Sequence, residues 1–223
     1  ALGLGSEDAE QNLINLTRVS DVLTEANNRA TGSVQEFAEA LTNKAATAME
    51  EMNVEVEEGV AVLAALAQRG KKGQVAGEML AIFLRDTTRA AVRNKEEFAK
   101  FNIEIFDQAG QLKNLADVVA EFETALGPMS DAEKAAALES LGMTRAVGDI
   151  IRVLTGSSGE IRNYETALRN AGGATKEVAD KQLESFNAQM KLLKNQLMDI
   201  AIEIGSKLVP KLLPLITWIR EHL

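Results

Sequence analysis

The stretch ADKQLESFNAQMKLLKNQLMDIAIEI, residues 179–204, carries apolar side chains at alternating steps of four and three. This spacing is a heptad repeat, and it predicts a long amphipathic helix whose apolar seam packs against another helix. The seam consists of Ala179, Leu183, Phe186, Met190, Leu193, Leu197, Ile200 and Ile204. Beside the seam, where a selective coiled coil usually carries charge, the chain has Gln182, Gln189 and Gln196. Two partners therefore stay open for the seam: other helices of the same chain, or a second copy of it.

The heptad pattern stops at Lys207, where the next apolar residue should fall. Because glycine and proline interrupt helices, we expect a hinge there. The hinge residues would be Gly205, Pro210 and Pro214. Together with the glycines that precede the seam, this pattern divides the chain into three parts. They are a helical domain at 1–173, the long heptad-patterned helix at 174–209, which Thr175 can cap, and an apolar tail at 210–223 that leads into absent sequence.

The tail has apolar residues on several sides, with cations and one tryptophan among them, as helices at a membrane interface do. Two interpretations stay open for it. The tail packs against protein that follows it, or it contacts a membrane surface. The interfacial residues in the second case would be Lys211, Trp218 and Arg220.

The composition favours helix over sheet. Of 223 residues 46% are apolar and 26% are charged, with only seven Phe, one Tyr, one Trp and three Pro. Few aromatic residues and many Ala, Leu, Glu, Lys and Gln are typical of helical proteins. Residues 102–106 are the exception, because they alternate apolar and polar side chains before the turn residues at 107–110. We therefore expect a mainly all-α, multi-helix domain with one small β-hairpin near 102–112 and a long C-terminal amphipathic helix.

Helix start signals occur at several places in the predicted domain. Ser33 with Glu36, and Ser130 with Glu133, have the spacing of capping boxes. The first of these predicts a helix that runs to Met52, after which a third helix would begin at a cap on Asn53, reach Leu66 and end at Gly70. Further helices are expected from the apolar periodicity at about 9–28, 115–126, 144–154 and 160–170, and from about residue 74 onward.

The net charge of −9 is spread evenly along the chain, and it predicts no basic face. A protein that binds nucleic acid without sequence preference needs clustered Lys and Arg, so the charge argues against that function. The absence of cysteine excludes disulfides and thiolate metal sites. Since no uncharged apolar run reaches about 18 residues, we expect no transmembrane helix. The chain begins with Ala1, and we expect it to be a piece of a longer protein.

No motif in the sequence predicts catalysis. The loop at 70–73 lacks the spacing of a phosphate-binding loop and is expected to be a turn between helices. The only histidine, His222, has no second partner for a metal or a catalytic serine. The acidic cluster at 50–58 is expected to be a solvated helix start, which suits carboxylates, and not a cation site. We therefore expect no enzyme, no cofactor and no metal site.

Several short phrases, in this order, resemble the core region of the phage tail tape measure protein family. They are VSDVLTEA at 19–26, EEGVAVLAALA at 57–67 with KGQVAG at 72–77, FDQAG at 106–110 with LADV at 115–118, MSDAEK at 129–134, and LLK at 192–194 with IEIG at 202–205 before LVP at 208–210. Each phrase alone is a common helical sequence. The resemblance rests on their order and covers essentially the full chain.

The resemblance implies a virion structural protein: an oligomeric helical chain in the lumen of the tail tube whose length sets tail length during assembly. It implies expulsion ahead of the genome, and it names tail tube proteins, tail tip proteins, tail assembly chaperones and further copies as partners. Sequence-specific binding of nucleic acid is not implied. The alternative is a membrane-active helical module that helps to form a path through the host envelope. Because of its many Gly and Ser breaks, this segment is expected to be a compact module within the ruler, with only the heptad stretch reaching about 40 Å as one helix.

Overall fold

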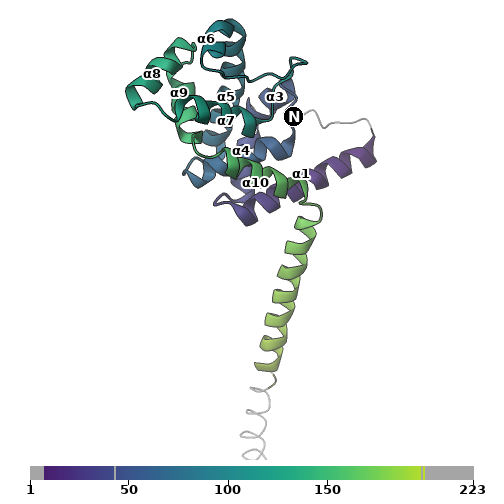
Figure 1. Ribbon diagram of the computed structural model, residues 1–223. Coiled ribbons are helices and arrows are strands. Elements are labelled where there is room, and N and C mark those ends of the chain that lie inside the picture. Colours follow the sequence, from purple (N-terminus) through teal and green to yellow (C-terminus); the bar gives the residue numbers. More distant parts are fainter. Residues whose placement is uncertain (1–7, 43, 197, 199–223) are drawn as a thin grey trace, which may run out of the picture. The chain divides into compact units, whose positions relative to one another are not determined.

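The computed structural model describes residues 8–42, 44–196 and 198. The chain divides into two compact units, Ala1–Thr175 and Lys176–Leu223. The described part of the first unit is a set of helices joined by turns, with one longer loop at 101–114 (Figure 1). They are α1 (Ala9–Arg29), α2 (Val34–Leu41), α3 (Lys44–Glu51), α4 (Val56–Gln68), α5 (Gly73–Arg93), α6 (Lys95–Lys100), α7 (Leu115–Leu126), α8 (Asp131–Ser140), α9 (Arg145–Leu154) and α10 (Ser158–Arg169).

Two of these helices begin with the capping boxes that the sequence predicts. At α2 the N–H of Ser33 donates to the Glu36 carboxylate at 2.8 Å, and the N–H of Glu36 donates back to the Ser33 hydroxyl at 3.1 Å. At α8 the N–H of Ser130 donates to the Glu133 carboxylate at 2.8 Å in the same arrangement. Both predictions are confirmed, since a capping box depends only on residues three positions apart.

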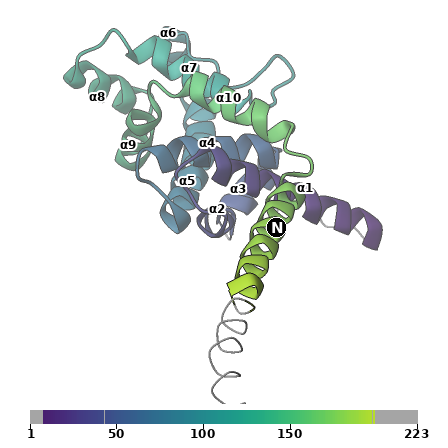
Figure 2. The same ribbon diagram turned by 90° about the horizontal axis from the view of Figure 1, so that it is seen from below.

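Helix α4 forms the centre of the first unit. Every residue from Val56 to Ala67 is buried, including two glutamates. The helix packs against α1, α5, α7 and α10, and it lies in the middle of the unit in both views (Figures 1 and 2). A helix that is apolar nearly all round must be enclosed by other helices, so α4 organises the core.

The boundaries of two early helices differ from the prediction. One helix was expected from Ser33 to Met52, but the chain forms α2 and α3 with a break between them. The predicted cap at Asn53 is also wrong: Asn53 has a positive φ of 54°, and Glu55 holds the N-cap position of α4. The break lets α2 and α3 each pack against α5 separately.

The predicted β-hairpin near 102–112 is wrong. No β-strand is present in the described residues, and the segment is a loop with a single antiparallel bridge between Phe106 and Leu112. The side chains of Ile103 and Ile105 alternate with polar ones because they are buried in the helical core, not because they line a sheet. The pairing cannot extend, since the N–H of Ile103 bonds back to the carbonyl of Phe98 and Asn114 already caps α7.

The described part of the second unit is helical, from the first residues of the unit to 196 and again at 198. Its side chains are exposed apart from a partly buried Val178. Within the described residues, neither unit contains a helix that is both long enough and apolar enough to cross a membrane.

Candidate functional site

The apolar seam predicted from the heptad repeat lies on the helix of the second unit. Leu183, Phe186, Met190 and Leu193 are exposed, with 59%, 58%, 47% and 48% of their surface accessible. From Ala179 to Leu193 the seam covers about 21 Å at about 1.5 Å per residue. Because large exposed apolar patches are common at protein interfaces, this row is the candidate interaction surface of the second unit.

Other predicted residues lie outside the described part of the chain. These are the seam residues Leu197, Ile200 and Ile204, the hinge residues Gly205, Pro210 and Pro214, and the interfacial residues Lys211, Trp218 and Arg220. Two further exposed apolar residues of this helix, Leu192 and Met198, lie outside the seam at c and b positions and were not predicted. They do not fit the a and d positions, so the heptad rule alone would not find them.

A cluster of charged side chains lies where α1, α4, α7 and α10 meet. Arg18 of α1 donates from Nε and Nη2 to the two carboxylate oxygens of Glu57, each at 2.6 Å. The Glu57 side chain is only 5% exposed, whereas that of Arg18 is 42% exposed. The expectation of a solvated helix start is therefore wrong for Glu57, because a partner 39 residues earlier in the sequence covers it.

Glu58 is the second buried carboxylate of this cluster. Its Oε1 accepts the N–H of Leu115 at 2.6 Å, so it caps the first turn of α7. Burial raises the pKa of Glu58 to about 7; the Leu115 N–H acts against that shift, and the carboxylate of Glu165 adds to it. Glu58 is thus a carboxyl group that titrates near neutral pH inside the core.

The remaining members of the cluster connect α7 with α10. Asn114 donates from Nδ2 to Glu165 at 2.8 Å, and Arg169 donates from Nη2 to the other oxygen of Glu165, also at 2.8 Å. Arg169 also pairs with Glu55, which precedes α4. Among the described residues, no group of three or more His, Cys, Asp or Glu is arranged to hold a metal ion. The cluster binds helices to one another, which is a structural role.

The cluster predicts a specific pH dependence. The pKa of Glu58 is raised from 4.5 to about 7, so between these values the folded chain binds more protons than the unfolded chain. The free energy of unfolding should therefore fall as the pH rises from about 4.5 to about 7. At pH 8 Glu58→Gln should raise the stability by about 2 kcal/mol, because a neutral amide still accepts the Leu115 N–H.

Urea unfolding of the full chain, followed by far-ultraviolet circular dichroism, measures this effect. The matched control is Glu50→Gln, which changes an exposed carboxylate and should leave the stability within about 0.5 kcal/mol at both pH values. At pH 4 the stabilising effect of Glu58→Gln should disappear. Equal stability of Glu58→Gln and the unchanged chain at pH 8 would contradict the prediction.

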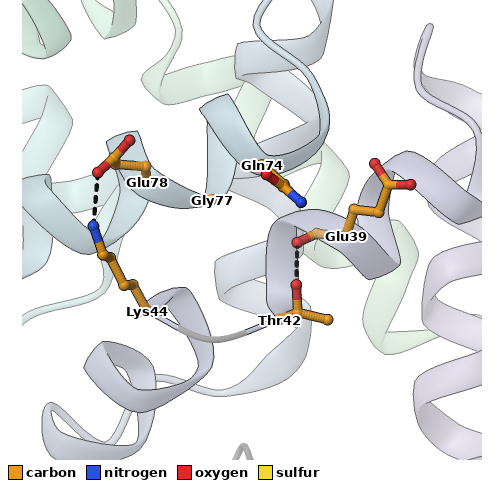
Figure 3. Close-up of a pocket in the computed structure, with 6 residues that line it drawn as sticks. All are labelled: Glu39, Thr42, Lys44, Gln74, Gly77 and Glu78. Carbon is orange, nitrogen blue, oxygen red and sulfur yellow. Dashed lines mark hydrogen bonds and ion pairs between the residues drawn. The ribbon is translucent and has the colours of Figure 1, made fainter.

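A small cavity of about 140 Å³ lies between the α2–α3 turn and the start of α5. Figure 3 shows the Lys44 side chain pointing toward Glu78, with 2.8 Å between Nζ and Oε1, while the Glu39 carboxylate points elsewhere. Gly77 forms one wall, and a Cβ at this position would lie 2.1 Å from the carbonyl oxygen of Ala40. The polar groups do not converge on a common point, so this cavity is not a candidate site.

The structure confirms one further prediction and corrects another. The loop at 70–73 joins α4 to α5 and is a turn between helices, as predicted. The expected cap at Thr175 is wrong, because residue 174 is already helical and the buried carboxylate of Asp21 accepts the N–H groups of Gly173 and Thr175 at 2.8 and 2.9 Å. Burial raises the pKa of Asp21, but the Gly173 N–H together with the side chain and the N–H of Thr175 more than offset it and hold this pKa below its ordinary value.

Comparison with known proteins gives two matches and one negative result. Residues 2–142 match the family model described as phage-related minor tail protein. The tape measure protein of Pneumococcus phage Dp-1 is 24% identical over 197 residues, which is 87% of this chain and 17% of that protein. The chain thus spans about a sixth of the length of this curated relative. No solved structure matches.

Proposed function

The chain belongs to the family of phage-related minor tail proteins, and on this basis we propose that it is a structural segment of a tape measure protein. In this role it sets tail length during assembly and is expelled when the genome is ejected. Its place would be the tail lumen and, on ejection, the host envelope. The partners would be tail tube and tail tip proteins, tail assembly chaperones and further copies of the chain.

The observation that carries this proposal is the similarity to a tape measure protein over 87% of the chain. The helical architecture supports it, because a helix rises about 1.5 Å per residue and so converts chain length linearly into distance. The two units would contribute unequally to a ruler. The first unit is compact, whereas the helical residues 176–196 of the second unit alone extend about 30 Å.

Tail length should respond to the length of this helix. Deleting residues 180–193 from the parent gene removes two heptads, keeps the seam in register, and should shorten the tail by about 21 Å, at about 1.5 Å per residue. Duplicating the same residues should lengthen the tail by the same amount. The measurement is electron microscopy of assembled particles.

The control replaces residues 180–193 by a helical sequence of equal length. If only the length of the segment determines tail length, particles with this control sequence should have tails of normal length. Unchanged tails in both the deletion and the duplication would reject the ruler role for this segment, and particles without tails would indicate that the segment is needed before length is set.

We further propose that the seam packs against the same seam of a second copy. With Leu183 and Met190 at a positions, the flanking g positions are Gln182 and Gln189. In a parallel, in-register pair these amides face Asn187 and Lys194 of the other copy, so no like charges oppose each other. A neutral flank suits a partner of identical sequence.

Self-association of the chain should therefore depend on the seam. Leu183→Gln with Phe186→Gln removes two exposed apolar layers and should weaken self-association at least about tenfold. Glu184→Gln, which changes a neighbouring exposed residue outside the seam, should leave it unchanged. Analytical ultracentrifugation of the full chain distinguishes these results. A monomeric unmodified chain at all concentrations would exclude pairing through the seam.

A further inference from the structure

The outer face of α5 carries three arginines at four-residue intervals: Arg85, Arg89 and Arg93. The opposite side of the helix is buried against α2, α3, α4 and α9. The side chains of Arg85 and Arg89 are 49% and 54% exposed, and Arg93 is also exposed. We call these three residues the arginine row. The even charge of the sequence predicted no basic face, so this row is a local exception in a chain of net charge −9.

One carboxylate, Asp86, orders the first two arginines. Arg85 donates from Nε to Asp86 Oδ1 at 2.7 Å, and Nη1 of Arg89 lies 3.7 Å from the same oxygen. The hydrogen bond from Arg85 holds the pKa of Asp86 below its ordinary value, so Asp86 stays ionised at neutral pH. Arg93 has no ion pair with any residue that the structure describes. Three cations and one anion leave the row with a net charge of about +2.

The fold gives no reason for this arrangement. Like charges four residues apart destabilise a helix by a few tenths of a kcal/mol per pair, at roughly the magnitude by which opposite charges stabilise it. The helix dipole favours a cation in the last turn, which accounts for Arg93 but not for Arg85 and Arg89. None of the three guanidinium groups binds a residue of another helix within the described chain.

Aliphatic side chains flank the arginine row. Val92 is exposed next to Arg93, and Ile82, three residues before Arg85, is partly buried. Arginine mixed with apolar side chains is typical of protein interfaces. A surface for nucleic acid would instead need a larger cluster of cations than this row, whose net charge is only about +2.

We propose that the arginine row is a docking surface for an acidic α-helix of a protein partner, with Asp or Glu at four-residue intervals. Residues four apart on any helix are separated by about 6 Å along its axis, so carboxylates at this interval match successive guanidinium groups. Each guanidinium can bind a carboxylate with two hydrogen bonds. Val92 and Ile82 would contact apolar residues beside those carboxylates. This surface is independent of the seam and of the ruler function.

The test uses the full chain and a synthetic, alanine-based helical peptide with Glu at every fourth position and Leu beside each Glu. Nuclear magnetic resonance titration should show shifts at the arginine side chains of α5, and the affinity should fall as salt is added. Arg89→Gln with Arg93→Gln, which leaves the Arg85–Asp86 pair intact, should weaken binding about tenfold. Arg152→Gln is the matched control, because it neutralises an equally exposed arginine of α9, and it should not change the affinity.

Two further ligands test whether the row recognises aligned carboxylates of a helix or any negatively charged molecule. A peptide of the same composition with its glutamates distributed around the helix should bind at least about fivefold more weakly than the aligned peptide. A DNA duplex should bind no better than this distributed peptide. The proposal is wrong if both peptides bind equally, if the double variant binds the aligned peptide as well as the unmodified chain does, or if DNA binds the row more tightly than the aligned peptide.

Discussion

Gly77→Ala should destabilise the first unit by about 3 kcal/mol or more, although the same change in an ordinary helix interior stabilises by up to about 1 kcal/mol. The reason is the close approach of α2 and α5. A Cβ on Gly77 would lie 2.1 Å from the carbonyl oxygen of Ala40, and its carbonyl carbon and Cα are within 3 Å as well. These are backbone atoms of a helix, so no side-chain rotation can relieve the contact. Either the two helices separate or the core beside them repacks.

The control is Gly159→Ala in α10. Like Gly77 this glycine is helical, but it is exposed, and a Cβ there would meet no atom within 4 Å. The exchange should be neutral or stabilise the chain by up to about 1 kcal/mol. Urea unfolding of both variants measures the difference, with circular dichroism as the probe. Similar stabilities for Gly77→Ala and Gly159→Ala would mean that α2 and α5 do not approach as closely as the structure has them.

The contrast between these two glycines illustrates what sequence can and cannot predict. Both occur in helical patterns, and only the packing of α2 on α5 makes Gly77 essential. The capping boxes at Ser33 and Ser130, which join two residues of one turn, were predicted correctly, whereas the single-residue caps at Asn53 and Thr175 were wrong. The alternation at 102–106 was misread because a loop that buries every second side chain against helices has the same pattern as a strand.

The charged residues were misjudged for a related reason. Glu57 and Glu58 were expected in solvent because carboxylates suit a helix start, but their partners are Arg18 and the N–H of Leu115, 39 and 57 residues away. The four-residue spacing of the arginine row is visible in the sequence. Its significance is not, because only the packing of α5 determines that those residues face outward.

Breaking the Arg18–Glu57 pair should have the second large effect. Arg18→Ala is expected to lower the free energy of unfolding by about 3 kcal/mol, near the lower end for buried pairs because Arg18 itself is 42% exposed. The cost comes mainly from Glu57. Its side chain is 5% exposed, and its carboxylate would lose both hydrogen bonds from the guanidinium, with only the gap left by Arg18 to admit water.

If the lost stability comes from the unpaired charge of Glu57, removing that charge should restore it; a loss of packing would not be restored in this way. Adding Glu57→Gln to Arg18→Ala removes the unpaired charge and should restore most of the lost stability, since replacing both partners of a buried pair is often nearly neutral. Arg18→Lys, which keeps the charge but not the two parallel hydrogen bonds, should fall between the two. Arg152→Ala breaks an exposed pair with Asp149 and should cost at most about 1 kcal/mol.

Urea unfolding of the four variants at pH 7 separates the possibilities. If the double variant is no more stable than Arg18→Ala, the loss does not come from the unpaired charge of Glu57, and the aliphatic part of Arg18 holds α1 to α4 by packing. If the double variant recovers the stability of the unmodified chain, the pair adds little net stability, because its presence and its complete absence then cost about the same. Its role would be to destabilise any other register of α1 on α4, since such a register leaves Glu57 unpaired. The bidentate geometry, with both distances at 2.6 Å, favours recovery.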